Sequence, residues 1–312
     1  MAQRISWRLL SAIGLIIALS VFGFALLALL PGDYAEVVLI HQMDGDMPSA
    51  AALAAFKAEH GFDRALPVQY AGWLANMAQG DLGRSFATGD PVLDEVALRL
   101  KATFALVGTA FSITVLIGVP LGILAAVHRG SALDRVVMAG AVLGMSVPNF
   151  WQALLFVLLF SLTLGWLPSS GYGGAAHVIL PATVIATSSM GLTARYVRAG
   201  LIDALGAPHV RTALAKGLST REVVLSHALP TALPGLITLI ALQAARMFDG
   251  AIVVETIFAW PGLGRLFVES ILNRDYPVLQ ATILVVGVAY ILIHLAADAL
   301  IAWLDPRLDG AV

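Results

Sequence analysis

The sequence predicts an all-α integral membrane protein with six transmembrane helices. Of its 312 residues, 59% are hydrophobic and 12% are charged, and the mean hydropathy is +0.87. Soluble domains carry about 25% charged residues. Apolar runs of about 20 residues recur along the chain, each long enough to cross a hydrocarbon core of ~30 Å. The absence of cysteine excludes disulfides and thiolate chemistry.

The first predicted span covers residues 9–30 and follows two basic residues, Arg4 and Arg8. The apolar core of a cleavable signal peptide has only about 7 to 15 residues. This run is longer, so we predict an uncleaved membrane helix within an N-terminal segment of residues 1–30.

Residues 31–101 are predicted to form a large exterior loop, because acidic residues outnumber basic ones in it. Within this loop a short helix is expected from Ser49 to His60, closed by Gly61. A second helix, typical of the membrane interface, is indicated by residues at helical spacing: Tyr70, Trp73, Leu74 and Met77.

The core domain, residues 102–312, contains the other five predicted spans. Pro148 is expected to kink the third span, with neighbouring helices satisfying the freed carbonyl. Spans two to six are predicted at residues 103–127, 136–164, 178–194, 235–254 and 278–303.

A polar connection, residues 195–232, separates the fourth and fifth spans. Pro208 suits the first position of a short helix and Gly217 the left-handed residue that ends it. Ser219 and Glu222 form a capping box, which predicts a second helix from Thr220 toward Leu229. The first helix is expected to insert into a partner's groove with an exposed face made of His209, Val210, Arg211, Ala213, Leu214 and Lys216.

The spacing of Ala213, Gly217, Leu229 and Pro230 resembles the EAA loop of the membrane subunits of bacterial ABC importers. The phrase RTALAKGLS, followed by H-L and LP, is similar to the dipeptide, oligopeptide and nickel branch of that family. Arg211 stands where the motif has Glu, which is the usual form of this branch. Further resembling phrases are QGDLGRSFATGDPVLDEV, SVPNFW, GWLPSSG, VETIFAWPGLGRLF and LDPRL.

This resemblance implies the type I ABC importer permease fold, with a cytoplasmic coupling helix that docks on a separate ATP-hydrolysing subunit. The implied partners are a second, related permease, two ATP-binding subunits and an extracytoplasmic solute-binding protein. ATP and Mg would be bound by those subunits, so the chain itself is expected to be neither an enzyme nor a cofactor carrier. The implied cargo is a peptide or a similar small solute, with nickel complexes and glutathione-like solutes left open. The implied coupling residues are His209, Arg211, Ala213, Lys216, Gly217, Leu229 and Pro230.

Charge predicts the same orientation in a bacterial inner membrane, with both termini in the cytoplasm. The expected exterior basic residues are mostly in one long loop, where this rule counts least. The expected cytoplasmic basic residues are Arg4, Arg8, Arg129, Arg135, Arg195, Arg198, Arg211, Lys216, Arg221 and Arg307.

Arg246 and Asp249 are charged residues within the fifth predicted span, and a charge at that depth costs ~2.5 to 3.5 kcal/mol. They are expected either to neutralise each other as an ion pair or to line the translocation path. With His294 and Asp298 they would also form the relay of an ion-gradient-driven transporter, which is the alternative function. No paired helix interruptions typical of such transporters appear, and no phosphate-binding loop, HExxH or GxSxG motif is present.

Overall fold

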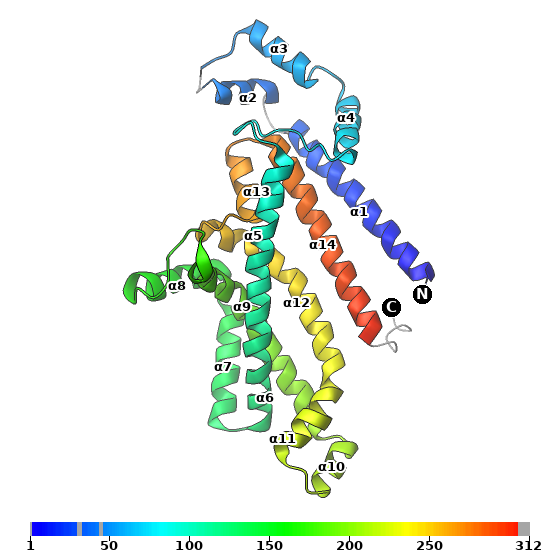
Figure 1. The fold of residues 1–312 in the computed structure, drawn as a ribbon, viewed down its shortest axis with the longest axis vertical. Helices are drawn as coiled ribbons and strands as arrows, with labels where there is room; N and C mark the ends of the chain where they lie inside the picture. Colours follow the sequence, from blue (N-terminus) through cyan, green and yellow to red (C-terminus); the bar gives the residue numbers. More distant parts are fainter. Residues whose placement is uncertain (1, 30–32, 44–45, 305–312) are drawn as a thin grey trace. The chain divides into compact units, whose positions relative to one another are not determined.

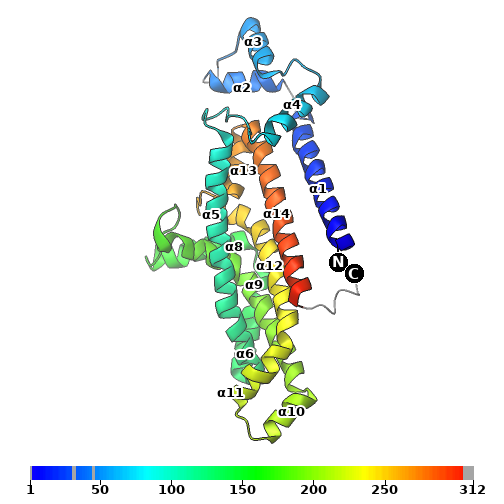
Figure 2. The same ribbon diagram turned by 45° about the vertical axis from the view of Figure 1, so that its right-hand side comes forward.

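The computed structural model describes residues 2–29, 33–43 and 46–304. In this part of the chain the ordered elements are helices, and the sole strand-like feature is an isolated bridge between Arg84 and Pro91. The all-α prediction is confirmed. The chain divides into two compact units (Figures 1 and 2). Unit 1 contains Met1–Ala102 and Pro261–Ile291, and unit 2 contains Thr103–Trp260 and Leu292–Val312.

The helices of the described residues follow the predicted order. They are α1 (Ala2–Leu29), α2 (Tyr34–Gln42), α3 (Ala50–His60), α4 (Leu66–Ala78), α5 (Val92–Ile113), η1 (Thr114–Gly118), α6 (Val119–Val127), α7 (Ala132–Ser146), α8 (Asn149–Phe156), η2 (Val157–Thr163), α9 (Gly174–Leu205), α10 (Pro208–Ala215), α11 (Thr220–Val223), η3 (Val224–Ala228), α12 (Leu229–Ile257), α13 (Leu263–Leu272) and α14 (Tyr276–Leu304).

Four continuous helices in the described residues are long and apolar enough to cross a membrane: Val92–Val127, Gly174–Leu205, Thr220–Ile257 and Tyr276–Ala297. A fifth candidate is the pair α7 and α8–η2, and α1 contributes a shorter apolar stretch, Leu10–Ala25. The predicted positions of Leu30, Pro31 and the end of the LDPRL phrase lie outside the described residues.

The third predicted span is broken rather than kinked. Its two halves, α7 and α8–η2, are bent by 109° around Pro148. Proline has no N–H, so the carbonyl of Gly144 loses its usual helical partner. The side chain of Gln152 replaces that partner, because its Nε2 donates to the carbonyl oxygens of Gly144 and Val147, both at 2.9 Å. The chain therefore satisfies these carbonyls through its own next helix, where neighbouring helices were expected to do so.

The predicted helix from Thr220 toward Leu229 does not end there. It continues through η3 into α12 as one helix, Thr220–Ile257. Pro230 lies just after the π turn η3, and a π turn widens the helix locally. Pro120 follows η1 in the same way within the second span. Both prolines are thus accommodated inside spans rather than between helices.

In unit 1 the two helices predicted in the exterior loop are present. Ser49 caps α3 through its side chain, which accepts from the N–H of Ala52 at 3.1 Å, and Gly61 ends it with φ +69°. Tyr70 of α4 contacts α1, where its hydroxyl lies 2.8 Å from the hydroxyl of Ser20 and its ring meets Phe24 edge to face. These contacts fix α4 against α1.

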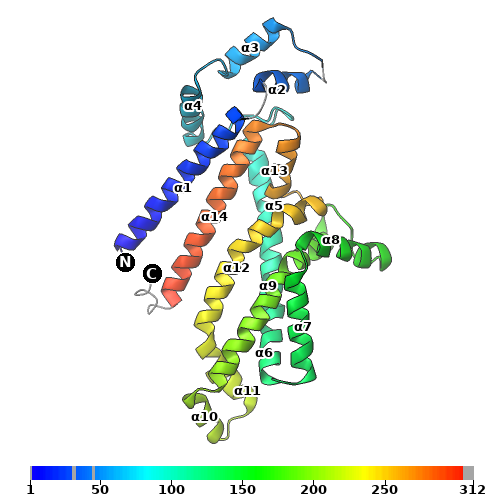
Figure 3. The ribbon, with the colours of Figure 1, turned by 180° about the vertical axis from the view of Figure 1, so that it is seen from behind.

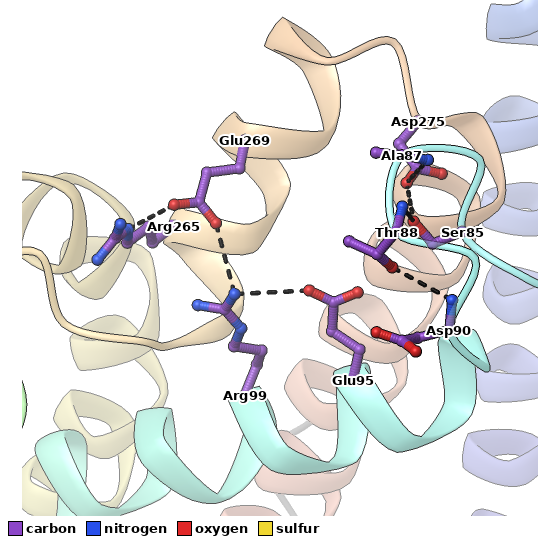
Figure 4. A network of polar contacts seen from close by, with 9 residues as sticks. All are labelled: Ser85, Ala87, Thr88, Asp90, Glu95, Arg99, Arg265, Glu269 and Asp275. Atoms are coloured by element: carbon purple, nitrogen blue, oxygen red, sulfur yellow. Dashed lines mark hydrogen bonds and ion pairs between the residues drawn. The ribbon is translucent and has the colours of Figure 1, made fainter. Parts of the chain in front are cut away.

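A second set of contacts in unit 1 holds the segment before α5 (Figure 4). Asp275 is buried, and its carboxylate accepts from the hydroxyl of Ser85 and from the backbone N–H groups of Phe86 (3.2 Å) and Ala87 (3.3 Å). The segment is therefore tied to residues almost 200 positions later in the chain, a connection that no sequence pattern indicated.

Charged side chains join α5 to α13 in the same unit. Arg99 lies 3.5 Å from Glu95 and 3.6 Å from Glu269, and Glu269 also pairs with Arg265 at 2.6 Å (Figure 4). All four side chains are partly exposed. Such pairs contribute little to stability individually, but as a connected group they fix the orientation of α13.

In unit 2, α6 and α7 pack on α9 through glycine. A Cβ at Gly122 would lie 2.6 Å from the carbonyl oxygen of Ala194, and a Cβ at Gly191 would lie 2.5 Å from that of Ala141. Small residues at such contacts let helix backbones approach closely, which stabilises helix packing inside a membrane. The three helices therefore meet backbone against backbone (Figure 1).

The first prediction follows from this contact. Gly191→Ala is expected to lower the stability of the purified complex by ~1–3 kcal/mol, because the added methyl group forces α7 away from α9. Chemical unfolding in detergent measures the change. Gly140→Ala is the matched control, since no heavy atom lies within 4 Å of a Cβ at that position of α7. Equal stability of the two variants would contradict the tight contact.

Candidate functional site: the coupling unit between α9 and α12

The coupling unit comprises α10, the turn after it and α11, and it lies at one end of α9 and α12 (Figure 3). Pro208 opens α10, as predicted, and its fixed φ suits the first helical position. One side of α10 is anchored in the protein. Val210 is fully buried and Ala213 is 6% exposed. They pack in an apolar cluster with Ala126, Leu201, Ala204, Val223, Val224 and Ala228.

The turn after α10 has the predicted glycine elbow. Gly217 adopts φ +85°, a conformation that costs an L-residue roughly 1–2 kcal/mol. The capping box is also confirmed: the N–H of Glu222 donates to the hydroxyl of Ser219 at 3.3 Å, and the N–H of Ser219 donates to the carboxylate of Glu222 at 2.9 Å. These local signals define where α10 ends and where α11 begins.

The exposed face of α10 differs from the expected one. Val210 and Ala213 were expected beside the basic residues, but they face the apolar cluster, so no partner reaches them. His209, Arg211, Leu214 and Lys216 are exposed, as expected. Positions 210 and 213 are three apart and share one helix face, which is why both are buried together. Ala213 is therefore an anchor of α10 and not a contact residue.

The other two residues expected at this site lie at the start of α12. Pro230 is exposed and Leu229 is partly buried against the apolar cluster. A polar contact joins α12 to α10, because His209 Nε2 lies 3.2 Å from the hydroxyl of Thr231. The elements on both sides of the elbow are thus connected.

An ion pair that sequence reasoning missed supports α9 near the coupling unit. Arg198 Nε and Nη2 donate to the two carboxylate oxygens of Asp134 at 2.6 and 2.8 Å. Asp134 is 4% exposed, and it also accepts from the N–H of Gly130 at 2.8 Å. Both residues had been assigned to cytoplasmic ends of spans by charge, but the sequence gave no signal that they pair across 64 positions.

The two charged residues expected in the translocation path are both exposed on α12. Arg246 and Asp249 form no ion pair with each other in the described structure, so the interpretation that they neutralise each other is wrong here. On the buried side of the same helix, Gln243 Nε2 donates to the hydroxyl of Thr193 at 2.8 Å. The expected pair of His294 with Asp298 is not described, because the side chain of Asp298 lies outside the described residues.

A further buried polar contact was also missed. Glu255 is fully buried near the end of α12, and it accepts from the hydroxyl of Thr103 at 2.6 Å. The sequence analysis placed residue 255 in a loop beyond the fifth span. Because α12 extends to Ile257, this carboxylate belongs to the helix bundle of unit 2.

Two family models together match almost the whole chain. Residues 118–310 match the binding-protein-dependent transport system inner membrane component, and residues 1–107 match the N-terminal part of the same kind of membrane component. The chain belongs to this family. It is therefore the membrane permease subunit of an ABC importer, and the prediction from the coupling-loop motif is confirmed.

Curated relatives of this permease extend over its full length. A putative peptide transport system permease protein of Brucella abortus (strain 2308) is 39% identical over 315 residues, covering 98% of this chain and 99% of the relative. The glutathione transport system permease protein of Pectobacterium atrosepticum is 40% identical over 301 residues, covering 96% and 97%. The permease thus falls in the branch that contains these proteins.

A solved structure supports the permease fold. The inward-facing MetNI methionine ABC transporter, in its native crystal form, matches with a TM-score of 0.58 at 20% identity, covering 67% of this chain and 96% of that chain. The permease is thus a multi-pass inner membrane protein that works with ATP-binding and substrate-binding partners. The alternative of an ion-gradient-driven transporter has no support among these relatives.

Proposed function

We propose that this permease forms half of a translocation path for peptides or closely related solutes such as glutathione. The observation that carries the proposal is the whole-length identity of 39–40% to peptide and glutathione permeases. In the proposed importer it pairs with a second permease, a different but related chain. Two ATP-binding subunits bind the ATP and Mg inside, and an extracytoplasmic protein delivers the solute. The chain itself catalyses no reaction, and both its termini lie in the cytoplasm.

We further propose that α10 transmits the movement of the ATP-binding subunits to the spans. Its exposed residues His209, Arg211 and Lys216 would contact the ATP-binding subunit, while its buried side is packed against α9. Movement of the docked subunit then displaces α9 and α12 through Val210 and Ala213. A conformational change of this kind requires the subunit to interact differently with two states of the permease.

Reconstitution tests the proposed function. The permease with its partner permease, both ATP-binding subunits and the binding protein should accumulate a labelled tripeptide in proteoliposomes only when ATP is enclosed. A proton uncoupler should leave this uptake unchanged. Uptake that persists without the ATP-binding subunits would contradict the proposal.

Arg246 and Asp249 are proposed to line the translocation path, where they offer both signs of charge to a zwitterionic solute. Exposed charges on an otherwise apolar helix support this role, because such residues usually face a water-filled path.

Arg246→Ala is expected to lower peptide uptake about tenfold, because a hydrogen bond to a charged group contributes ~1.5 kcal/mol. Complex assembly, measured by size-exclusion chromatography, should not change. Arg135→Ala removes an exposed arginine from the start of α7 and serves as the control. Normal uptake by the Arg246 variant would remove this residue from the path.

A further inference from the structure

Unit 1 contains a cavity of about 700 Å³ that no part of the proposed transport mechanism uses. One wall is a single face of α4, formed by Gln69, Gly72, Trp73 and Asn76, which are spaced at three and four residues. The opposite parts come from the segment before α5 and from the first turns of α14. Its size falls in the ~300–1,000 Å³ range of small-molecule sites.

The walls are held in place by the contacts already described in unit 1. Asp275 accepts hydrogen bonds from residues 85–87, and Phe86 from that segment lines the cavity. Tyr70 holds α4 against α1, so Trp73 one turn later keeps its place. A site whose walls are fixed in advance loses less entropy when a ligand binds.

Charges of both signs line the cavity. Arg64 makes no side-chain hydrogen bond or ion pair within the described part of the chain, and Arg84 makes one, to the carbonyl of Gly89 at 2.8 Å. Asp81 accepts from the N–H of Gly83 at 2.8 Å and retains a second carboxylate oxygen. Asp33 is already paired with Lys57. The lining thus presents guanidinium donors together with a carboxylate acceptor.

Gln280 supplies the observation that points most directly to a ligand. It lines the cavity, is only 6% exposed, and its Nε2 has no hydrogen-bond partner among the described residues. A buried donor without a partner costs about 1–3 kcal/mol. The terminal torsion of glutamine is soft, so the amide can turn toward an acceptor in the cavity.

We infer that this cavity binds a short peptide with free termini. The peptide carbonyl accepts from Gln280, the carboxylate terminus pairs with the arginines, and the amino terminus pairs with Asp81. Apolar side chains of the peptide lie against Trp73 and Phe86. The preference for a peptide over other zwitterions rests on the proposed function, but the site itself is built from unit 1, whereas Arg246 and Asp249 belong to unit 2.

Direct binding to the purified full complex tests the inference. The complex is placed in phosphatidylcholine nanodiscs without the solute-binding protein, and binding of the dipeptide Ala-Phe is measured by equilibrium dialysis. Gly72→Leu should weaken binding at least ~tenfold, because a Cβ at Gly72 meets no heavy atom within 4 Å and the new side chain fills the cavity. Ala71→Leu, on the same helix but outside the lining, should bind like the unmodified protein.

A second variant separates ligand binding from a structural role. Gln280→Leu should weaken Ala-Phe binding about tenfold and leave the unfolding midpoint without peptide undiminished, because it removes a donor that has no partner. N-acetyl-Ala-Phe and Ala-Phe-amide should each bind more weakly than Ala-Phe, since each lacks one charged terminus.

Three results would overturn the inference. They are equal binding by the Gly72→Leu and Ala71→Leu variants, a lower midpoint of Gln280→Leu without peptide, and a co-purifying phospholipid that Gly72→Leu releases while peptide binding stays unchanged. Peptide uptake by the reconstituted importer is measured separately. Loss of this site with normal uptake would leave the proposed function intact, whereas absent uptake with normal dipeptide binding would contradict the function alone.

Discussion

Gly217→Val is expected to separate ATP hydrolysis from uptake. The left-handed backbone at position 217 costs a side-chain-bearing residue roughly 1–2 kcal/mol, and a β-branched residue is poorly suited to it. No heavy atom lies within 4 Å of a Cβ there, so the whole effect comes from the backbone and not from a clash. A shift of this size lowers the fraction of permease with a correctly placed α10 by about tenfold.

The measurement is the ratio of solute transported to ATP hydrolysed in proteoliposomes. We expect this ratio to fall about tenfold in Gly217→Val, while ATP hydrolysis continues. Gly217→Asn is the control, because asparagine tolerates the left-handed conformation better than other residues with a side chain. Full coupling in the valine variant would refute the role of the elbow.

Asp134→Leu is expected to have the largest effect on stability. The carboxylate of Asp134 accepts three hydrogen bonds, two from Arg198 and one from Gly130. Removing one partner of a buried ion pair leaves the other charge uncompensated and costs about 3 kcal/mol. The unfolding free energy of the purified complex in detergent measures this loss.

A double-mutant cycle distinguishes the ion pair from general damage at this position. Arg198→Met alone should also destabilise the complex, but the double variant Asp134→Leu/Arg198→Met should be more stable than the sum of the two single losses implies. Additive losses would show that the two side chains do not stabilise each other.

Local signals predicted the parts of the fold that depend on neighbouring residues. Ser49 with Gly61, and Gly217 with the Ser219 capping box, marked helix ends that the structure contains. Pro148 correctly indicated a disturbed third span. Its bend of 109° was not predictable, because the angle depends on Gln152 pairing with carbonyls of the preceding helix.

The coupling unit was predicted in position but only partly in detail. The pattern of residues in α10 was read as a contact face, although the three-residue spacing of Val210 and Ala213 equally fits a buried face. Contacts between distant residues had no sequence signal. The pairing of Asp134 with Arg198 and that of Ser85 with Asp275 join positions 64 and 190 apart, and one sequence without relatives holds no record of such proximity.

The glycine contacts of α6 and α7 with α9 have a consequence for how the permease can move. Where backbones touch, no side chains lie between the helices that can switch rotamer to absorb sliding or rotation. These three helices must therefore travel as one rigid body during alternating access. The deformation has to be taken up by the segments that enter and leave that body, such as the break around Pro148.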